Sequence, residues 1–326
     1  MKKNRLYQVR SFGEKFNASF DSFKRAWKIL FRFSLYLLLP LSLLQTIGMD
    51  EYYSNVFASA AIGTDTPDQM TAIIQNGPAF SLIIAVSFVG TAFVVSLVYG
   101  LMKKYQQGGS LDGLTFKTFW KEAQGRGFQR VCNILLFGML LTILAFLVIG
   151  LLAAASLYSL IVTLPALLVF MVPLSLWAPI YLIEDDTHLV EALRKSYRYG
   201  MKTWGSLFVL ALVMTVIVYA VSCLLQIPGM VMIGIKALAF PQLDGFGSIA
   251  YSFITYVVMA AGTFFSWIAM LPYLFAFGYH YGSAAEQIDN VTAAEDIAHF
   301  DEMGDNNVDD PAFESKRSDI DDFEEL

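Results

Sequence analysis

The stretch VCNILLFGMLLTILAFLVIGLLAA, residues 131–154, contains no Asp, Glu, Lys, Arg or His. The hydrocarbon core of a bilayer is about 30 Å thick, and an α-helix crosses it in roughly 20 residues at a rise of about 1.5 Å each. A charge at the centre of such a helix costs roughly 2.5–3.5 kcal/mol on insertion. The length and composition of this stretch therefore predict a membrane-spanning helix.

Five further runs meet the same criterion, near residues 29–49, 79–102, 157–183, 206–227 and 249–280. The chain of 326 residues is 56% hydrophobic and only 15% charged, whereas a soluble domain carries about 25% charged residues. The sequence therefore predicts an all-α polytopic membrane protein. Its membrane domain, residues 1–285, is expected to contain six transmembrane helices.

Lys and Arg are distributed unequally among the segments that connect these runs. The segment before the first run, the second-to-third connection and the fourth-to-fifth connection together hold 18 of them. The alternate connections hold one, Lys236. Because basic loops are retained on the cytoplasmic side, we expect both termini in the cytoplasm. The expected location is the cytoplasmic (inner) membrane of a bacterium.

Basic, aromatic segments precede each pair of runs. In the first, the aromatic residues recur three or four positions apart and so share one helical face. These are Phe16, Phe20, Phe23 and Trp27. A second and weaker segment lies between Leu114 and Phe128. Amphipathic helices of this kind lie in the membrane interface, where their basic side chains reach anionic headgroups.

The third such segment follows the fourth run and has the clearest pattern. Asp186 or Thr187 is placed to cap it, and Glu191 is placed to pair with Lys195 one turn later. We predict that both outer segments are basic interfacial helices on the cytoplasmic side. The candidates for binding lipid headgroups are Lys24, Arg25, Lys28, Arg194, Lys195, Arg198 and Lys202.

The last segment, residues 286–326, holds 15 acidic and 2 basic residues, a net charge of −13, whereas residues 1–285 carry +7. Low hydrophobicity and high net charge predict a disordered, acidic cytoplasmic tail. Such a tail could contact a cytoplasmic protein partner, or compete with anionic lipids for the basic face. We expect no nucleic-acid partner.

A short motif lies between the fourth and fifth runs. It consists of Glu184, Asp185, Ala192, Leu193, Ser196, Trp204 and Gly205. On this motif the sequence resembles a group of bacterial six-helix membrane proteins. The group includes the membrane domain that precedes the catalytic domain of some glycerophosphodiester phosphodiesterases. The tail is too short and too acidic to be that catalytic domain, so the resemblance implies an architecture and a connection with lipids rather than an activity.

The remaining features are weaker signals. The acidic cluster Glu184–Asp186 could bind a divalent cation, but we favour capping of the next helix, so no metal site is predicted. His280 is interpreted as a surface histidine at the membrane edge. The glycines Gly278 and Gly282 could form a dimer contact. The apolar stretch from Pro228 to Phe240 is too short to span and predicts an interfacial or re-entrant segment.

Prolines interrupt the fourth run and also the first and sixth runs, which predicts kinks. These are Pro165, Pro173 and Pro179 in the fourth run, and Pro40 and Pro272 in the others. No Walker loop, GxSxG or HExxH pattern occurs in the sequence, and the two cysteines, Cys132 and Cys223, show no metal-ligand spacing. We therefore expect no catalytic residues and no cofactor.

Together these features favour a non-enzymatic integral membrane protein that interacts with lipids or acts as a scaffold. The alternative is a transporter or channel for a small or lipid-like molecule. The two differ in an observable way. A transporter needs a polar path into the helix bundle, whereas a lipid-binding protein needs a packed apolar core with apolar grooves on its surface.

Overall fold

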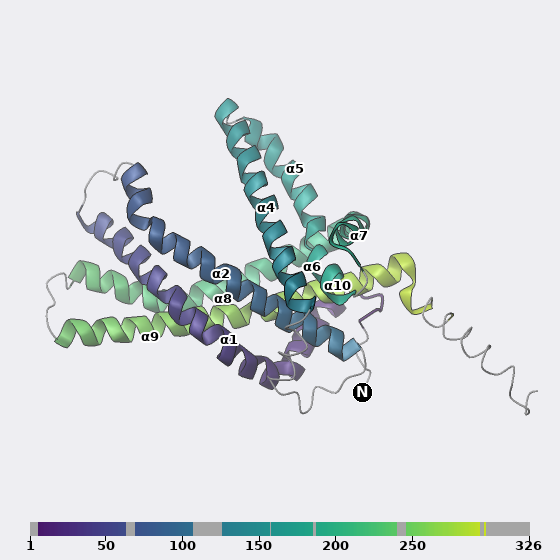
Figure 1. Ribbon diagram of the computed structural model, residues 1–326, viewed down its shortest axis with the longest axis horizontal. Helices are drawn as coiled ribbons and strands as arrows, with labels where there is room; N and C mark the ends of the chain where they lie inside the picture. The colour runs from purple at the N-terminus through teal and green to yellow at the C-terminus, as the bar shows by residue number, and fades with distance from the viewer. Residues whose placement is uncertain are drawn as a thin grey trace, which may run out of the picture.

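The computed structural model describes residues 6–62, 69–106, 126–156, 158–184, 187–239, 246–293 and 297. Within these ranges the chain is all-α and contains no strand. The helices labelled in Figure 1 are α1 (Phe12–Ile62), α2 (Gln69–Gln106), α4 (Arg126–Ala155), α5 (Ser159–Leu174), α6 (Trp177–Ile183), α7 (Leu189–Lys202), α8 (Trp204–Ala239), α9 (Phe246–Ala269) and α10 (Leu271–Asp289).

Six segments of the described chain are long and apolar enough to cross a membrane. They are Phe12–Phe57, Asn76–Gln106, Gln129–Leu152, Ile161–Ile183, Trp204–Lys236 and Ile249–Asp289. Each overlaps one of the six runs expected from the sequence, so the prediction of an all-α protein with six candidate transmembrane segments is confirmed. The predicted boundary of the tail at residue 286 falls inside α10, which continues to Asp289.

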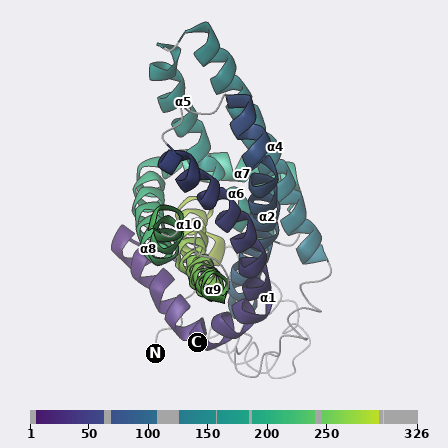
Figure 2. The same cartoon turned by 90° about the vertical axis from the view of Figure 1, so that its left-hand side faces the viewer.

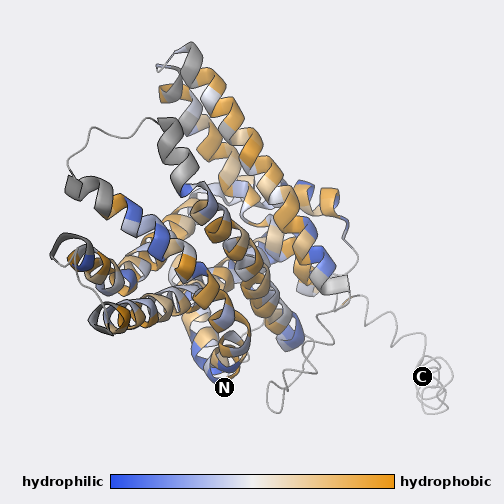
Figure 3. Cartoon of the chain, turned by 60° about the vertical axis from the view of Figure 1, so that its left-hand side comes forward, coloured by the Kyte–Doolittle hydropathy of each residue, from blue (hydrophilic) through white to orange (hydrophobic). Residues whose placement is uncertain are grey.

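The helices form two groups that diverge from a common end (Figure 1). Helices α1, α2, α8 and α9 pack on one another as a bundle, and the α4–α5 hairpin leans away from it. The hairpin exposes large apolar side chains on both of its helices, including Leu140, Leu151, Ile161 and Val162. Figure 3 shows this hydrophobic colouring along it. A surface of this composition suits contact with lipid tails.

Helix α1 is too long to be one straight span, because its 51 residues extend over roughly 77 Å at about 1.5 Å per residue. It changes direction instead. In Figure 2, α9 is seen nearly end-on while the purple N-terminal part of α1 extends across the view. Helix α7 is likewise seen nearly end-on in Figure 1, where α8 and α9 run across the picture. The first part of α1 and α7 therefore both lie crosswise to the bundle.

Two of the predicted proline interruptions are present as breaks between helices. The fourth span is divided into α5 and α6 just after Pro173, and the sixth into α9 and α10 just before Pro272. The other predicted interruptions, Pro40, Pro165 and Pro179, lie inside helices α1, α5 and α6. Pro228 likewise lies inside α8. The prediction of a separate interfacial segment after Pro228 is wrong, because α8 continues to Ala239. Membrane helices tolerate an internal proline when neighbouring helices pack around it.

The buried core lies where α1, α2 and α10 meet, and its largest fully buried side chains include Phe33, Tyr99, Phe277 and Tyr281. Gly278 and Gly282 contribute to this packing. A Cβ at Gly282 would collide with the carbonyl oxygen of Leu6, and one at Gly278 with Met102. Both glycines are therefore used for close approach within the chain, and the dimer contact considered for them is not supported.

Candidate functional site

Polar side chains collect at the common end of the two helix groups. They come from the residues before α1, the α6–α7 connection, α7 and α10. We call this cluster the polar hub, and its members are Tyr7, Arg10, Glu184, Thr187, Lys195, Tyr281 and Ser283. The hub joins segments that are more than 270 positions apart in the sequence.

Glu184 is the centre of the hub. Its carboxylate accepts hydrogen bonds from Lys195 Nζ at 2.6 Å, Thr187 Oγ1 at 2.5 Å and Tyr281 Oη at 2.6 Å. Burial alone would raise the pKa of Glu184, but these hydrogen bonds outweigh it and hold the pKa below its ordinary value. The same ion pair raises the pKa of Lys195 despite partial burial. Its neighbours therefore hold Glu184 in the ionised form and in a fixed position.

The interpretation of Glu184 as a helix cap is wrong. The residue before α7 is His188, and no side chain caps that helix, so Thr187 is not its cap either. Asp185 and Asp186 lie outside the described residues. Among the residues that the structure does describe, no group of three His, Cys, Asp or Glu side chains could hold a metal ion.

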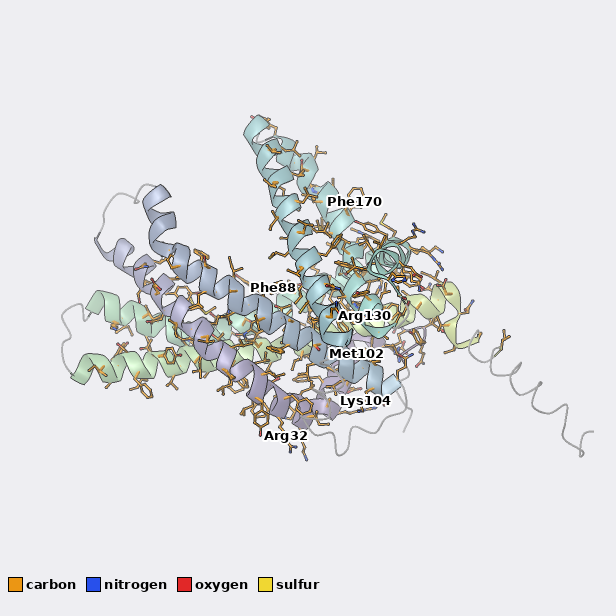
Figure 4. The ribbon with its side chains drawn as sticks, in the orientation of Figure 1. Arg32, Phe88, Met102, Lys104, Arg130 and Phe170 are labelled. Carbon is orange, nitrogen blue, oxygen red and sulfur yellow. The ribbon has the colours of Figure 1, made fainter. Side chains whose placement is uncertain are left out.

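Arg130 lies at the base of α4 (Figure 4) and hydrogen-bonds to the α6–α7 connection. Its guanidinium donates to the carbonyl oxygens of Tyr181 at 3.2 Å, Glu184 at 2.8 Å and Thr187 at 3.0 Å. It also lies 4.8 Å from the centroid of the Tyr181 ring. The last carbonyls of a helix have no partner within it, and Arg130 supplies one. In the sequence this arginine is only one of the basic residues of a connecting segment.

The residues before α1 are fastened to α10. The backbone N–H of Arg10 donates to Ser283 Oγ at 3.1 Å, and the hydroxyls of Tyr7 and Tyr281 are 3.2 Å apart. Ser11 and Glu14 then form a capping box, in which Glu14 Oε2 accepts from the Ser11 N–H at 2.7 Å and Ser11 Oγ accepts from the Glu14 N–H at 3.4 Å. The spacing of Ser11 and Glu14 was a sequence signal for this helix start.

His280 is fully buried, so its interpretation as a surface histidine is wrong. Its Nδ1 is 3.4 Å from Lys15 Nζ and its Nε2 is 3.0 Å from Thr203 Oγ1. The Thr203 hydroxyl donates its single proton to the carbonyl of Tyr199 at 2.9 Å. It must therefore accept from Nε2–H, which leaves Nδ1 to accept from Lys15. An arrangement in which the hydroxyl has already donated its proton does not activate Thr203 as a nucleophile.

Helix α7 packs through a row of small residues four positions apart, Ala192, Ser196 and Gly200, all of which are buried. A Cβ at Gly200 would lie 2.6 Å from the Cα of Pro173, so the two backbones are in close contact. Ser196 Oγ donates to the carbonyl of Pro173 at 2.5 Å. Small residues in such positions let helices approach closely in membrane proteins.

Trp204 donates a hydrogen bond to a carbonyl of α5 that Pro173 leaves without a helical partner. Proline lacks an N–H, so the carbonyl of Val169, four positions earlier, loses its helical partner. The indole N–H of Trp204 donates to that carbonyl at 3.3 Å. Together with Ser196, this gives two residues of the short motif a structural role at the α5–α7 junction. Ala192 is buried, Leu193 packs against the core, and a Cβ at Gly205 would meet nothing within 4 Å.

The seven headgroup candidates divide into two sets. Lys195 pairs with Glu184 and, at 3.6 Å, with Glu191, as the sequence predicted. Arg198 pairs with Asp289 at the end of α10. The other five are exposed and make no ion pair with any residue in the described ranges. They are Lys24, Arg25 and Lys28 on the first part of α1, and Arg194 and Lys202 on α7.

An apolar groove runs beneath the first part of α1. It encloses about 310 Å³, and its walls come from three places in the chain. These are the aromatic face of α1 (Phe20, Phe23, Trp27), one face of α8 (Met214, Ile217, Val218, Val221, Leu225) and the α9–α10 junction (Phe265, Ile268, Ala269, Pro272). All twelve lining residues are apolar.

Inside the bundle, one group of polar side chains bond to one another. Gln45 accepts from the indole N–H of Trp267 at 3.1 Å and donates to Ser87 Oγ at 3.1 Å. A second cavity, on the surface of α4, is lined by Ile143, Leu147, Gly150 and Leu151 and is apolar as well. Neither cavity provides a polar path between the helices.

No protein-family model, curated protein sequence or solved structure matches this chain. The resemblance to the membrane domain of glycerophosphodiester phosphodiesterases therefore stays a prediction, and the roles of the residues rest on their geometry.

Proposed function

We propose that this protein is a non-enzymatic, multi-pass membrane protein that binds anionic phospholipids at the end of the molecule where the polar hub lies. The observation that carries the proposal is the pair of crosswise helices, α7 and the first part of α1. The first part of α1 packs its aromatic face on α8 and α10, and α7 packs its small residues on α5 and α6. Both helices expose basic residues that have no ion-pair partner in the described part of the chain. Such a helix suits the interface, where its cations meet lipid phosphates.

The proposed orientation follows from the distribution of charge. The basic residues of α1 and α7 belong to the segments that hold 18 Lys and Arg residues, and such segments remain in the cytoplasm. The hub end would then face the cytoplasm, in the inner membrane of a bacterium. There, anionic lipids contribute about 1 kcal/mol of attraction for each Lys or Arg near the surface.

Three observations weigh against the other functions considered. The carboxylate of Glu184 accepts three hydrogen bonds, and the hydroxyl of Thr203 has donated its proton. Glu184 is therefore not arranged as a catalytic base, nor Thr203 as a nucleophile. The cavities described above are apolar. A transporter would need ionisable or polar groups along a path through the bundle, whereas Gln45 bonds to Ser87 and Trp267, and none of the three lines either cavity.

The proposal is tested with nanodiscs that contain equal amounts of phosphatidylglycerol and phosphatidylcholine. The protein is released from them, and native mass spectrometry counts the lipids that it retains. The wild-type protein should retain phosphatidylglycerol in excess. Lys202→Gln should lower this preference about fivefold, because the loss of about 1 kcal/mol for one cation corresponds to that factor. Glu51→Gln, which removes one exposed charge toward the C-terminal end of α1, is the control and should change little. Retention of the two lipids in the supplied ratio by wild-type protein would refute the proposal.

A further inference from the structure

The apolar groove lies directly against the most basic part of α1. Lys24 follows Phe23 and Lys28 follows Trp27, and an α-helix turns by about 100° at each residue. The two lysines therefore form a row, one turn apart, along the edge of the aromatic wall. Both are exposed, whereas Phe20 and Phe23 are half-buried in the groove. The groove thus has an apolar interior and a cationic rim.

One wall of the groove lies at the junction of α9 and α10. Met270 separates the two helices, and Ala269 and Pro272 on either side of it both line the groove. On the other side, the residues of α8 recur at helical spacing, from Met214 to Leu225, and present one face. The aromatic wall is packed as well, with the rings of Phe23 and Trp27 5.1 Å apart. The groove is therefore a formed concavity between three elements.

An apolar concavity with a cationic rim matches one kind of membrane molecule. In the bilayer an acyl chain is already surrounded by hydrocarbon, so the groove offers it packing contacts rather than removal from water. The phosphate of the same molecule gains from a nearby lysine. A volume of about 310 Å³ is in the usual range for ligand sites. Lysine side chains reach past apolar surface to place their ammonium groups at the headgroup level. A neutral apolar molecule would make no use of the rim.

We propose that this groove holds one acyl chain of an anionic phospholipid whose phosphate is bound by Lys24 and Lys28. The inference rests on the proposed function, which it narrows to one site on α1. It differs from that proposal in requiring a defined stoichiometry, since the groove has room for a chain of one lipid beside the row of two lysines.

Two residues of α8 provide a matched pair of variants. Val221 lines the groove and Val216 does not, and both are exposed, so neither substitution overfills the core. In nanodiscs with equal phosphatidylglycerol and phosphatidylcholine, Val221→Phe should retain one lipid fewer than wild-type protein in the native mass spectrum. Val216→Phe should retain the wild-type number. The double variant Lys24→Glu/Lys28→Glu should lose the phosphatidylglycerol preference of that one lipid.

The proposal for the groove is overturned if Val221→Phe retains as many lipids as Val216→Phe. It is also overturned if wild-type protein is a dimer and Val221→Phe dissociates it without loss of lipid, because a second copy would then occupy the groove. These results differ from a failure of the proposed function, in which wild-type protein shows no preference for phosphatidylglycerol at all. The lysine variant keeps the test decisive if Val221→Phe does not fold.

Discussion

The carboxylate of Glu184 receives hydrogen bonds from Lys195 of α7, Tyr281 of α10 and Thr187 of its own connection. Hydrogen bonds to a charged group contribute about 1.5–3 kcal/mol when one partner is removed. Glu184→Gln removes the charge and places an N–H group against donors. We expect it to destabilise the fold by about 2 kcal/mol, measured as a lower Tm in detergent micelles.

Glu191→Gln is the control for this substitution. Glu191 contacts the same Lys195 at 3.6 Å, but it is half-exposed, and an exposed pair one helical turn apart contributes only about 0.3–0.5 kcal/mol. Its Tm should stay close to that of wild-type protein. An equal loss in the two variants would show that the charge on α7, rather than the hub, is what matters.

The stability that Glu184 provides should depend on pH in one direction. Its pKa in the folded protein lies below the ordinary value of 4.5, so folding favours the ionised form. The contribution is present above about pH 4.5 and is lost as the pH falls through the lower, folded-state pKa. The Tm advantage of wild-type protein over Glu184→Gln should therefore be constant near neutral pH and shrink in acid. An advantage that grows in acid would contradict the assignment.

The sequence predicted the chemistry of these residues only in part. The pairing of Glu191 with Lys195 was predictable, because both lie on one helix at a fixed spacing. The contact of Glu184 with Tyr281 and the burial of His280 were not. Helical periodicity shows which side chains share a face, but it does not show which distant helix covers that face.

At the scale of elements, α7 depends on its close contact with the end of α5. Gly200→Ala would place a methyl group 2.6 Å from the Cα of Pro173, and a backbone atom cannot move aside cheaply. Overpacking of this kind costs about 1–3 kcal/mol, more than the roughly 1 kcal/mol that Ala gains over Gly in a helix. We expect a lower Tm and faster proteolysis of the α6–α7 connection.

Gly205→Ala is the matched control, because a Cβ there meets nothing within 4 Å. The gain in helix propensity should make this variant neutral or slightly more stable than wild-type protein. If Gly200→Ala behaves in the same way, α7 does not need its contact with Pro173.

The elements themselves were the most predictable part of the fold. A long uncharged run must be satisfied by its own backbone hydrogen bonds in lipid, so its helical state follows from composition. The effect of each proline was less predictable. Pro173 and Pro272 lie at breaks, whereas Pro228 lies inside α8. The difference depends on neighbouring side chains, such as Trp204, whose indole N–H donates to the Val169 carbonyl that Pro173 leaves without a helical partner.

At the scale of the whole molecule, the proposed orientation predicts which surfaces face each side of the membrane. Exposed positions for the test are Arg194 on α7, Gln287 on α10 and Tyr158 at the tip of the α4–α5 hairpin. Each is changed to Cys in a background with Cys132→Ala and Cys223→Ala. In intact cells a membrane-impermeant maleimide should label only the Tyr158→Cys protein. Labelling of Arg194→Cys from outside would show that the orientation is the opposite of the one proposed.

The polar hub also has a consequence for how the protein is made. The N–H of Arg10 donates to Ser283, 273 positions later in the chain. At roughly 5–20 residues per second, a ribosome needs on the order of 14–55 s to synthesise that interval. Throughout this time α1 is available for insertion. The residues before α1, which include Tyr7 and Arg10, have none of their partners from α10. Closure of the hub therefore has to wait for synthesis of α10, and a nascent chain arrested before Tyr281 would leave that segment without its partners.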